Sequence, residues 1–127
     1  MSFTIRTFIL ILALYVCNGA ASKETEFVTK AIAQNRVVVF SKTNCPNCNT
    51  VKQQLEYLVT KKGFKTIEMD QLANGKQIQD ALELLTAIPT VPYVFVNGKF
   101  IAGETDLKDM HQSGQLQKEL YNKRNKK

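Results

Sequence analysis

The chain has 127 residues, of which 44% are hydrophobic and 22% are charged, and its formal net charge is +6. This composition excludes a long disordered or collagen-like protein and fits one globular domain. The positive charge is scattered, apart from Lys61-Lys62 and a basic tail over 123–127, and no aromatic residues alternate with that tail. Because platforms for nucleic acids combine basic with aromatic side chains, we expect no nucleic-acid partner.

The first 21 residues have the pattern of a secretory signal peptide. Arg6 precedes an apolar run over 8–17, and the small residues Gly19-Ala20-Ala21 follow it. We expect cleavage after Ala21, which leaves one domain over 22–127 in the secretory pathway or outside the cell. The run of about ten apolar residues is shorter than the roughly 20 that cross a bilayer, so we expect no stable membrane span. A signal anchor in an endomembrane compartment and a mitochondrial presequence stay open as alternatives.

Helical and strand patterns alternate along the first half of the domain. A helix is predicted over 24–35, and the β-branched and aromatic run over 37–40 predicts a buried strand. A second helix is predicted over 46–63, since proline favours the first helical position and glycine marks a helix end. A second short strand is predicted over 65–69. The inner face of the first helix is expected to include Phe27.

The third predicted helix covers residues 74–87. Asn74 and Gln77 are spaced almost as in a capping box, which predicts a helix start at Asn74. Leu85 is expected on the inner face of this helix, and Pro89 ends it.

The last elements are a hairpin and a helix. Asn97-Gly98 between two apolar runs predicts a hairpin over 93–101. Thr105 or Asp106 is then expected to cap one last helical stretch, with Leu116 and Leu120 as its apolar contacts. A strand–helix–strand unit forms a parallel pair, whereas a hairpin adds antiparallel strands. The sequence therefore predicts an α/β fold, with a mixed four-stranded sheet and helices on both faces.

Two cysteines carry the candidate chemistry of the domain. Of the three in the chain, Cys17 lies in the leader, so Cys45 and Cys48 remain. A disulfide between them closes too short a loop to stabilise the fold much. Cys45 precedes a helix start, where free backbone N–H groups, the helix dipole and the cation of Lys42 favour a thiolate. We therefore expect Cys45 to attack disulfides and Cys48, further into the helix, to resolve the product.

Two structural alternatives for the cysteine pair are an inert disulfide and a zinc half-site. An intrachain zinc site needs two more Cys or His ligands, and only His111 remains, so we expect no metal. With a Cys-Pro-x-Cys upstream, the Val91-Pro92 bond is expected to be cis and to face Cys45.

Three separated motifs resemble those of a dithiol glutaredoxin. They are Val38-Val39-Phe40-Ser41-Lys42-Thr43-Asn44-Cys45-Pro46-Asn47-Cys48, Thr90-Val91-Pro92 and Ile101-Ala102-Gly103-Glu104-Thr105-Asp106. This resemblance implies a thioredoxin-like fold, glutathione as co-substrate, and reduction of protein disulfides and protein–glutathione mixed disulfides. The implied partners are glutathione and disulfide-bonded or glutathionylated proteins, and we expect a monomer.

The same resemblance implies a glutathione site. Lys42 and Gln79 match positions that hold the glycine carboxylate, and Val91, beside Pro92, matches the one whose backbone pairs with the cysteinyl part. Thr105 and Asp106 match the γ-glutamyl end, where a helix N-terminus takes a carboxylate. The chain departs from the usual pattern at three positions, which are Asn47 in place of tyrosine, Ala102 in place of glycine and Pro89 in place of a basic residue.

Three rival functions stay open. A secretory leader is compatible with a thioredoxin-like or isomerase-like oxidant, because the endoplasmic reticulum is more oxidising than the cytosol. Some members of the family bridge an iron–sulfur cluster between two subunits with glutathione, although proline after the first cysteine usually opposes it. A non-catalytic secreted binding protein is the third rival, and intact Cys45, Cys48 and Pro92 argue against it.

Overall fold

The computed structural model describes residues 22–59 and 63–124, so the predicted signal peptide lies outside the described residues. The described part of the chain alternates helices with short strands. In chain order the elements are α2 (Lys23–Gln34), β1 (Val37–Ser41), α3 (Pro46–Val59), β2 (Lys65–Glu68), the 3-10 turn η1 (Met69–Gln71), α4 (Gly75–Thr86), β3 (Tyr93–Val96), β4 (Lys99–Ile101), α5 (Gly103–Gln112) and α6 (Gln115–Arg124).

The four strands form one mixed sheet in the order β2-β1-β3-β4, as the sequence predicts. β1 pairs in parallel with β2, where Ser41 is the partner of Glu68, and antiparallel with β3, where Phe40 is the partner of Tyr93. β3 and β4 form the predicted antiparallel hairpin. All five residues of β1 are buried, which fits a central strand with apolar layers on both of its faces.

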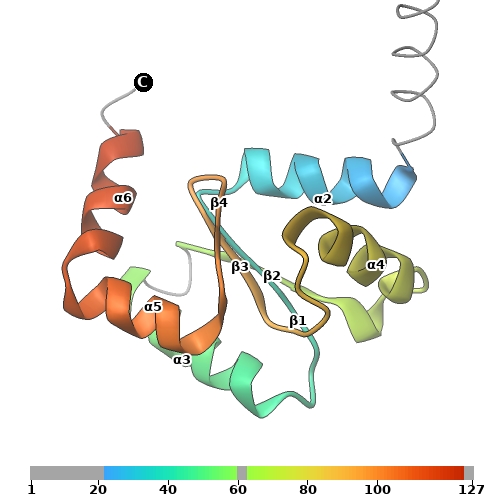
Figure 1. Cartoon of the computed structure of the whole chain (residues 1–127), viewed down its shortest axis with the longest axis horizontal. Coiled ribbons are helices and arrows are strands. Elements are labelled where there is room, and N and C mark those ends of the chain that lie inside the picture. Colours follow the sequence, from blue (N-terminus) through green and yellow to red (C-terminus); the bar gives the residue numbers. More distant parts are fainter. Residues whose placement is uncertain (1–21, 60–62, 125–127) are drawn as a thin grey trace, which may run out of the picture.

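Helices cover both faces of this sheet (Figure 1). Each face has its own apolar core. One core joins α2 and α4 to the sheet through side chains such as Val28, Leu82 and Phe95. The other joins α3, α5 and α6 to the opposite face through Leu55 and Leu116, among others. Within the described ranges, no helix is long and apolar enough to cross a membrane. The three-layer arrangement confirms the predicted fold class.

The C-terminal helical region differs from the prediction. It consists of two helices, because Gly114 adopts a left-handed conformation (φ +79°) between α5 and α6. α5 also begins earlier than predicted, with Ala102 at the N-cap position and no side-chain cap. Thr105 and Asp106 therefore lie within the first turn of α5, and the prediction that one of them caps a single helix was wrong.

The start of α4 is set by backbone packing. Asn74 is at the predicted N-cap position, but its side chain makes no capping hydrogen bond, so the expected capping box does not form. Gly75 follows it, and a Cβ atom there would lie 1.9 Å from the carbonyl oxygen of Met69. Only glycine fits this close approach, which brings α4 against the end of β2 and η1.

Candidate active site

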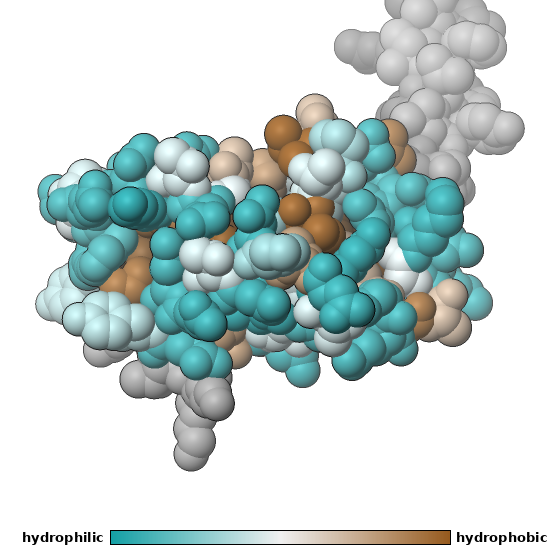
Figure 2. Space-filling view, turned by 90° about the horizontal axis from the view of Figure 1, so that it is seen from below, coloured by the Kyte–Doolittle hydropathy of each residue, from teal (hydrophilic) through white to brown (hydrophobic). Residues whose placement is uncertain are grey.

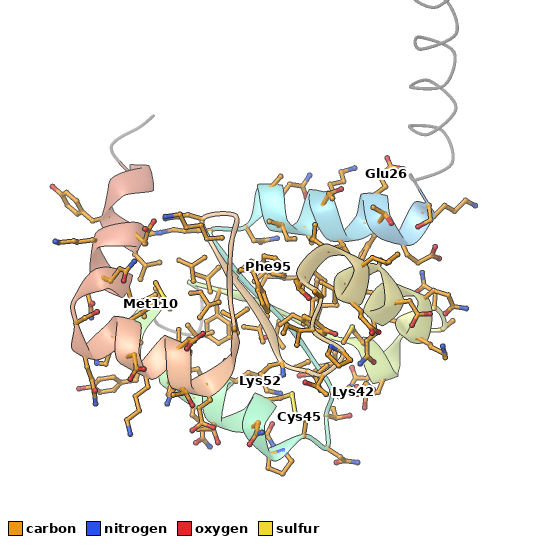
Figure 3. The ribbon with its side chains drawn as sticks, in the orientation of Figure 1. Glu26, Lys42, Cys45, Lys52, Phe95 and Met110 are labelled. Carbon is orange, nitrogen blue, oxygen red and sulfur yellow. A yellow bond between two sulfur atoms is a disulfide. The ribbon has the colours of Figure 1, made fainter. Side chains whose placement is uncertain are left out.

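Cys45 and Cys48 lie where β1 passes into α3, at the lower edge of the molecule in Figure 3. Their sulfurs form a disulfide, and their Cα atoms are 5.2 Å apart. Cys48 is fully buried on the inner face of α3, whereas Cys45 is partly exposed before the helix. An incoming disulfide can therefore reach Cys45, while Cys48 lies beneath it.

The start of α3 provides a favourable environment for a negative charge on Cys45. The backbone N–H of Cys48 donates a hydrogen bond to the Cys45 sulfur at 3.1 Å. The Asn49 N–H donates to the Cys45 carbonyl oxygen at 3.0 Å, which closes the first helical turn after Pro46. The free N–H groups and the positive end of the helix dipole both favour a thiolate over a thiol. The predicted position of the Cys45 sulfur at a helix N-terminus is confirmed.

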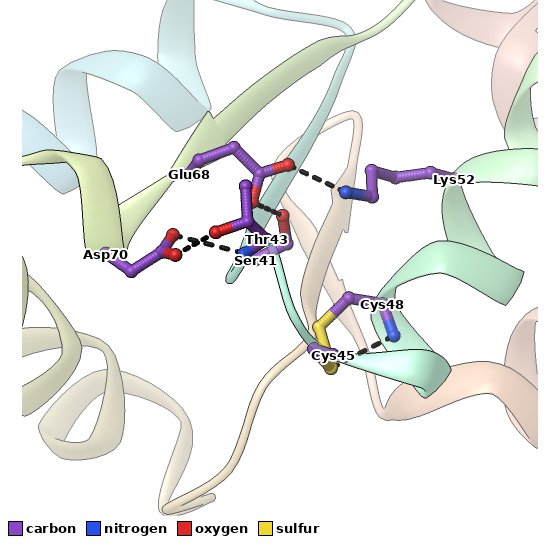
Figure 4. Close-up of polar contacts among 7 residues, drawn as sticks. All are labelled: Ser41, Thr43, Cys45, Cys48, Lys52, Glu68 and Asp70. Carbon is purple, nitrogen blue, oxygen red and sulfur yellow. Dashed lines mark hydrogen bonds and ion pairs between the residues drawn. A yellow bond between two sulfur atoms is a disulfide. The ribbon is translucent and has the colours of Figure 1, made fainter.

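Asp70, in η1, holds the loop that leads to Cys45. Its carboxylate accepts hydrogen bonds from the Thr43 backbone N–H, at 3.1 Å, and from the Thr43 hydroxyl (Figure 4). The hydrogen bond from the Thr43 side chain is the main reason that the pKa of Asp70 lies below its ordinary value of 3.8, and the Lys42 ammonium lowers it as well. The ionised carboxylate thus fixes the backbone two residues before Cys45.

This lowered pKa predicts a pH-dependent effect of the substitution Asp70→Asn. An acid whose pKa is lower in the folded state stabilises the fold above its unfolded pKa and loses this effect as the pH falls through its folded pKa. We expect Asp70→Asn to unfold at a lower temperature than wild type at neutral pH. The gap should close only below about pH 3.8, the ordinary value. Thermal unfolding of both proteins between pH 7 and pH 2 measures the gap, and a constant gap would contradict the prediction.

Glu68, at the end of β2, connects β1 with α3. One carboxylate oxygen accepts a hydrogen bond from the Ser41 hydroxyl at 2.6 Å, and the other pairs with the Lys52 ammonium at 2.7 Å (Figure 4). Ser41 is fully buried, and the Lys52 and Glu68 side chains are only 21% and 17% exposed. The roles of Ser41, Lys52, Glu68 and Asp70 were not predicted from the sequence. Among these four residues, only Lys52 has a sequence feature that links it to the cysteines, because it follows Cys48 by one helical turn.

Lys42 and Gln79 line one groove of about 570 Å³ beside η1 and α4. The lining of this groove carries both signs of charge. Lys42 and Lys76 are its cations, and Asp70, Asp80 and Glu83 are its carboxylates. The Gln79 side chain also donates a hydrogen bond to the Pro89 carbonyl oxygen at 3.1 Å. The structure therefore brings together the two residues that the sequence analysis assigned to one carboxylate.

The segment before β3 contains the predicted cis bond between Val91 and Pro92. Pro92 is buried, and Val91 is half-buried and packs against the core on the α2 and α4 side. The hydroxyl of the fully buried Tyr93 donates to the Ile88 carbonyl oxygen at 2.7 Å, and burial raises the pKa of this hydroxyl. Tyr93 and Gln79 thus hold neighbouring carbonyl groups of this segment.

The remaining predicted site residues are exposed. Asn47 lies in the first turn of α3, and Thr105 and Asp106 lie in the first turn of α5. Asp106 lines a different hollow, together with Phe100, and not the groove of Lys42 and Gln79.

The face seen from below in Figure 2 is mostly hydrophilic, but apolar side chains reach its surface near the centre. In the described residues, no group of three or more His, Cys, Asp or Glu side chains is arranged to hold a metal ion.

Sequence comparisons connect this site with one family. The Glutaredoxin family model matches residues 37–101. Glutaredoxin-C8 of Oryza sativa subsp. japonica is 41% identical over 103 residues, which are 81% of this chain and 75% of that protein. A glutaredoxin of Vernicia fordii is 47% identical over 85 residues, 67% of this chain and 80% of that protein. Mitochondrial glutaredoxin-2 of Bos taurus is 40% identical over 98 residues, but this chain spans only 61% of its length.

Solved structures agree with the sequences. Oxidized glutaredoxin 2 from Chlamydomonas reinhardtii has a TM-score of 0.73 and 36% identity, and the match covers 79% of this chain and 92% of that one. A buckwheat glutaredoxin–glutathione complex has the same TM-score and identity, and its match covers 78% of this chain and 88% of that one. The sequence resemblance, the thioredoxin-like fold and the cysteine pair thus agree. The chain belongs to the glutaredoxin family, and Cys45 and Cys48 form a Cys-x-x-Cys pair of the dithiol type.

Proposed function

We propose that this glutaredoxin uses glutathione to reduce protein disulfides and protein–glutathione mixed disulfides, with Cys45 as the nucleophile and Cys48 as the resolving cysteine. The observation that carries the assignment of roles is the hydrogen bond from the Cys48 N–H to the Cys45 sulfur at 3.1 Å. The partial exposure of Cys45 and the complete burial of Cys48 support the same division.

The proposed cycle begins with the Cys45 thiolate. It attacks one sulfur of the substrate disulfide, a new disulfide forms between Cys45 and that sulfur, and the other sulfur leaves as a thiolate. For a glutathionylated substrate Cys45 now carries glutathione, and a second glutathione attacks it, which forms glutathione disulfide and releases the Cys45 thiolate. For a protein disulfide, Cys48 attacks the Cys45 sulfur, which forms the internal disulfide and releases the second substrate thiolate. Two glutathione molecules reduce an internal Cys45–Cys48 disulfide and leave as glutathione disulfide, so electrons and atoms balance. Both cysteines of this cycle come from one chain, so we propose that the protein acts as a monomer.

An electron-donor comparison tests the proposed function. Wild-type protein receives a glutathionylated protein and, separately, a disulfide-bonded protein as substrate. Each is supplied with either glutathione or a dithiol reductant, and the released thiols are measured. We expect glutathione to support turnover of both substrates. Turnover with the dithiol reductant but not with glutathione would contradict the proposed function and favour a thioredoxin-like enzyme.

We propose that glutathione binds across the groove of Lys42 and Gln79 and along the segment of Val91 and Pro92. Asn47, in the first turn of α3, is a further proposed contact of glutathione, and Thr105 and Asp106 form the proposed site for the γ-glutamyl end. Support comes from the shared groove of Lys42 and Gln79 and from the free N–H groups at the start of α5.

Lys42→Met tests this site, because methionine keeps an apolar stem but removes the cation. The loss of one charged hydrogen bond is expected to raise KM for a glutathionylated substrate by roughly tenfold, equivalent to about 1.4 kcal/mol. Steady-state kinetics measure the change. Lys76→Met is the matched control, since Lys76 lines the same groove but pairs with Asp80 at 3.4 Å. An equal rise in both variants would contradict a specific role of Lys42.

We also propose that residues 1–21 direct the chain into the secretory pathway and are removed, which leaves the domain 22–127. The support is the order of Arg6, the apolar run and the small residues. Mitochondrial import is the alternative, and the names of several relatives, such as the bovine one, favour it. N-terminal sequencing of the mature protein after cell fractionation separates the two proposals.

A further inference from the structure

A single carboxylate holds both ends of the segment that contains the two cysteines. Ser41 lies at the end of β1, four residues before Cys45, and Lys52 lies in α3, four residues after Cys48. Both are bound by Glu68, at 2.6 Å and 2.7 Å (Figure 4). We call these three side chains the Glu68 bracket.

The Glu68 bracket differs from an ordinary surface ion pair. The Ser41 side chain is fully buried, and about four fifths of the Lys52 and Glu68 side chains are shielded from water. Hydrogen bonds and ion pairs in such surroundings are stronger and less screened than exposed ones. Both oxygens of the carboxylate have partners, so the strand end and the helix are held at the same time.

The bracket acts on the relative position of the two cysteines. β1 carries the loop that ends at Cys45, and α3 carries Cys48 one helical turn before Lys52. While the Cys45–Cys48 disulfide is closed, the covalent bond fixes the two sulfurs. When this bond is open, the two cysteines depend on noncovalent contacts such as the Glu68 bracket for their alignment.

We propose that Glu68 is a positioning residue for the resolving step, and that it sets the effective concentration of Cys48 towards mixed disulfides of Cys45. In this step the Cys48 thiolate attacks the Cys45 sulfur, the internal disulfide forms, and the bond from Cys45 to the substrate sulfur breaks. The substrate sulfur leaves as a thiolate, so no further oxidant is needed. The inference rests on the proposed function, because it assigns resolution to Cys48.

The partition between two oxidised forms measures this effective concentration. Reduced protein is equilibrated with fixed concentrations of glutathione and glutathione disulfide, quenched with acid and analysed by mass spectrometry. The ratio of internal disulfide to glutathione adduct reports how well Cys48 is placed. Glu68→Gln removes the negative charge that compensates the shielded Lys52 ammonium and so weakens the link to α3. We therefore expect this ratio to fall by about tenfold, as for a modest misplacement of reacting groups.

Two further variants control for folding and burial. Ser41→Ala keeps the ion pair and removes only one arm of the bracket, so the ratio should fall less, and in the same direction. Glu119→Gln is the matched control, because the Glu119 side chain on α6 is 21% exposed, close to the 17% of Glu68, and pairs with Lys99 at 2.8 Å. The Glu119→Gln ratio should equal that of wild type.

A double variant separates positioning from general destabilisation. In a Cys48→Ser background no resolving step by Cys48 exists, so adding Glu68→Gln should leave the rate of deglutathionylation by glutathione unchanged. A merely structural role of Glu68 would lower that rate in both backgrounds. An unchanged ratio in Glu68→Gln, or an equal change in Glu119→Gln, would overturn the inference.

The same measurement with a small disulfide in place of glutathione disulfide tests the role of Glu68 independently of the glutathione site. Hydroxyethyl disulfide and its thiol form the same type of adduct on Cys45 and need no binding groove. If wild type forms this adduct but none with glutathione, the proposed function fails, and the ratio measured with hydroxyethyl disulfide still decides on Glu68.

Discussion

Cys45→Ser is expected to reduce the activity towards every disulfide substrate to the uncatalysed background. A serine hydroxyl is not ionised near neutral pH and does not attack disulfides at a useful rate, even with the Cys48 N–H and the helix dipole beside it. The buried Cys48 cannot replace it, since an incoming disulfide does not reach this sulfur. Thiol release from both substrate classes, measured on the folded variant, checks the result.

Cys48→Ser is expected to separate the two activities. Glutathione can still resolve a glutathione adduct of Cys45, so deglutathionylation should persist, whereas most reduction of protein disulfides should be lost. The ratio of the two rates in wild type and in Cys48→Ser is the measurement. A variant that is inactive towards glutathionylated substrates, combined with a wild type that works equally well with a dithiol donor, would contradict the glutathione mechanism.

Phe40→Ala is expected to lower the free energy of unfolding by about 3–5 kcal/mol, which is a large part of the roughly 5–15 kcal/mol typical of a domain. Phe40 is fully buried in the central strand, and its ring meets Phe95 edge-on at a centroid distance of 6.1 Å. Its removal leaves a cavity in the core that α2 and α4 form with the sheet. Urea unfolding at 25 °C measures the loss.

Tyr57→Ala is the control for that prediction. The Tyr57 side chain is 86% exposed on α3, so its removal deletes an aromatic ring without opening a cavity. The change should stay within about 0.5 kcal/mol, as is usual for surface substitutions. A similar loss in Phe40→Ala and Tyr57→Ala would contradict the two-core description of the fold.

Local patterns predicted the elements that depend on local interactions. The β-branched run of β1, Pro46 at the start of α3 and the Asn97-Gly98 turn all lie as expected. The predicted inner faces were less accurate, because Phe27 is 41% exposed and Leu85 is 54% exposed. A 3.6-residue period indicates the middle of an apolar face, but its margins depend on how α2 and α4 share one side of the sheet.

The missed residues of the site depend on strand register. Glu68 meets Ser41 only because β1 and β2 pair in parallel with these two residues side by side. Lys52 reaches the same carboxylate across 16 residues of sequence. No local motif encodes such a contact, whereas the cysteines and Pro92 belong to short motifs. The same limit applies to α5, whose start depends on the backbone at Gly103 (φ +87°) and not on a capping side chain.

The second apolar core also defines the smallest part of the chain that can be expected to fold. The segment shared with the family model ends at residue 101, yet Leu107, Leu116 and Leu120 of the two last helices lie in the same core as Val39 and Val94. A version shortened to residues 37–101 would expose this side of the sheet to water and to other copies of itself. Domain boundaries for expression, or for transfer of the catalytic unit into a fusion protein, should therefore include α5 and α6.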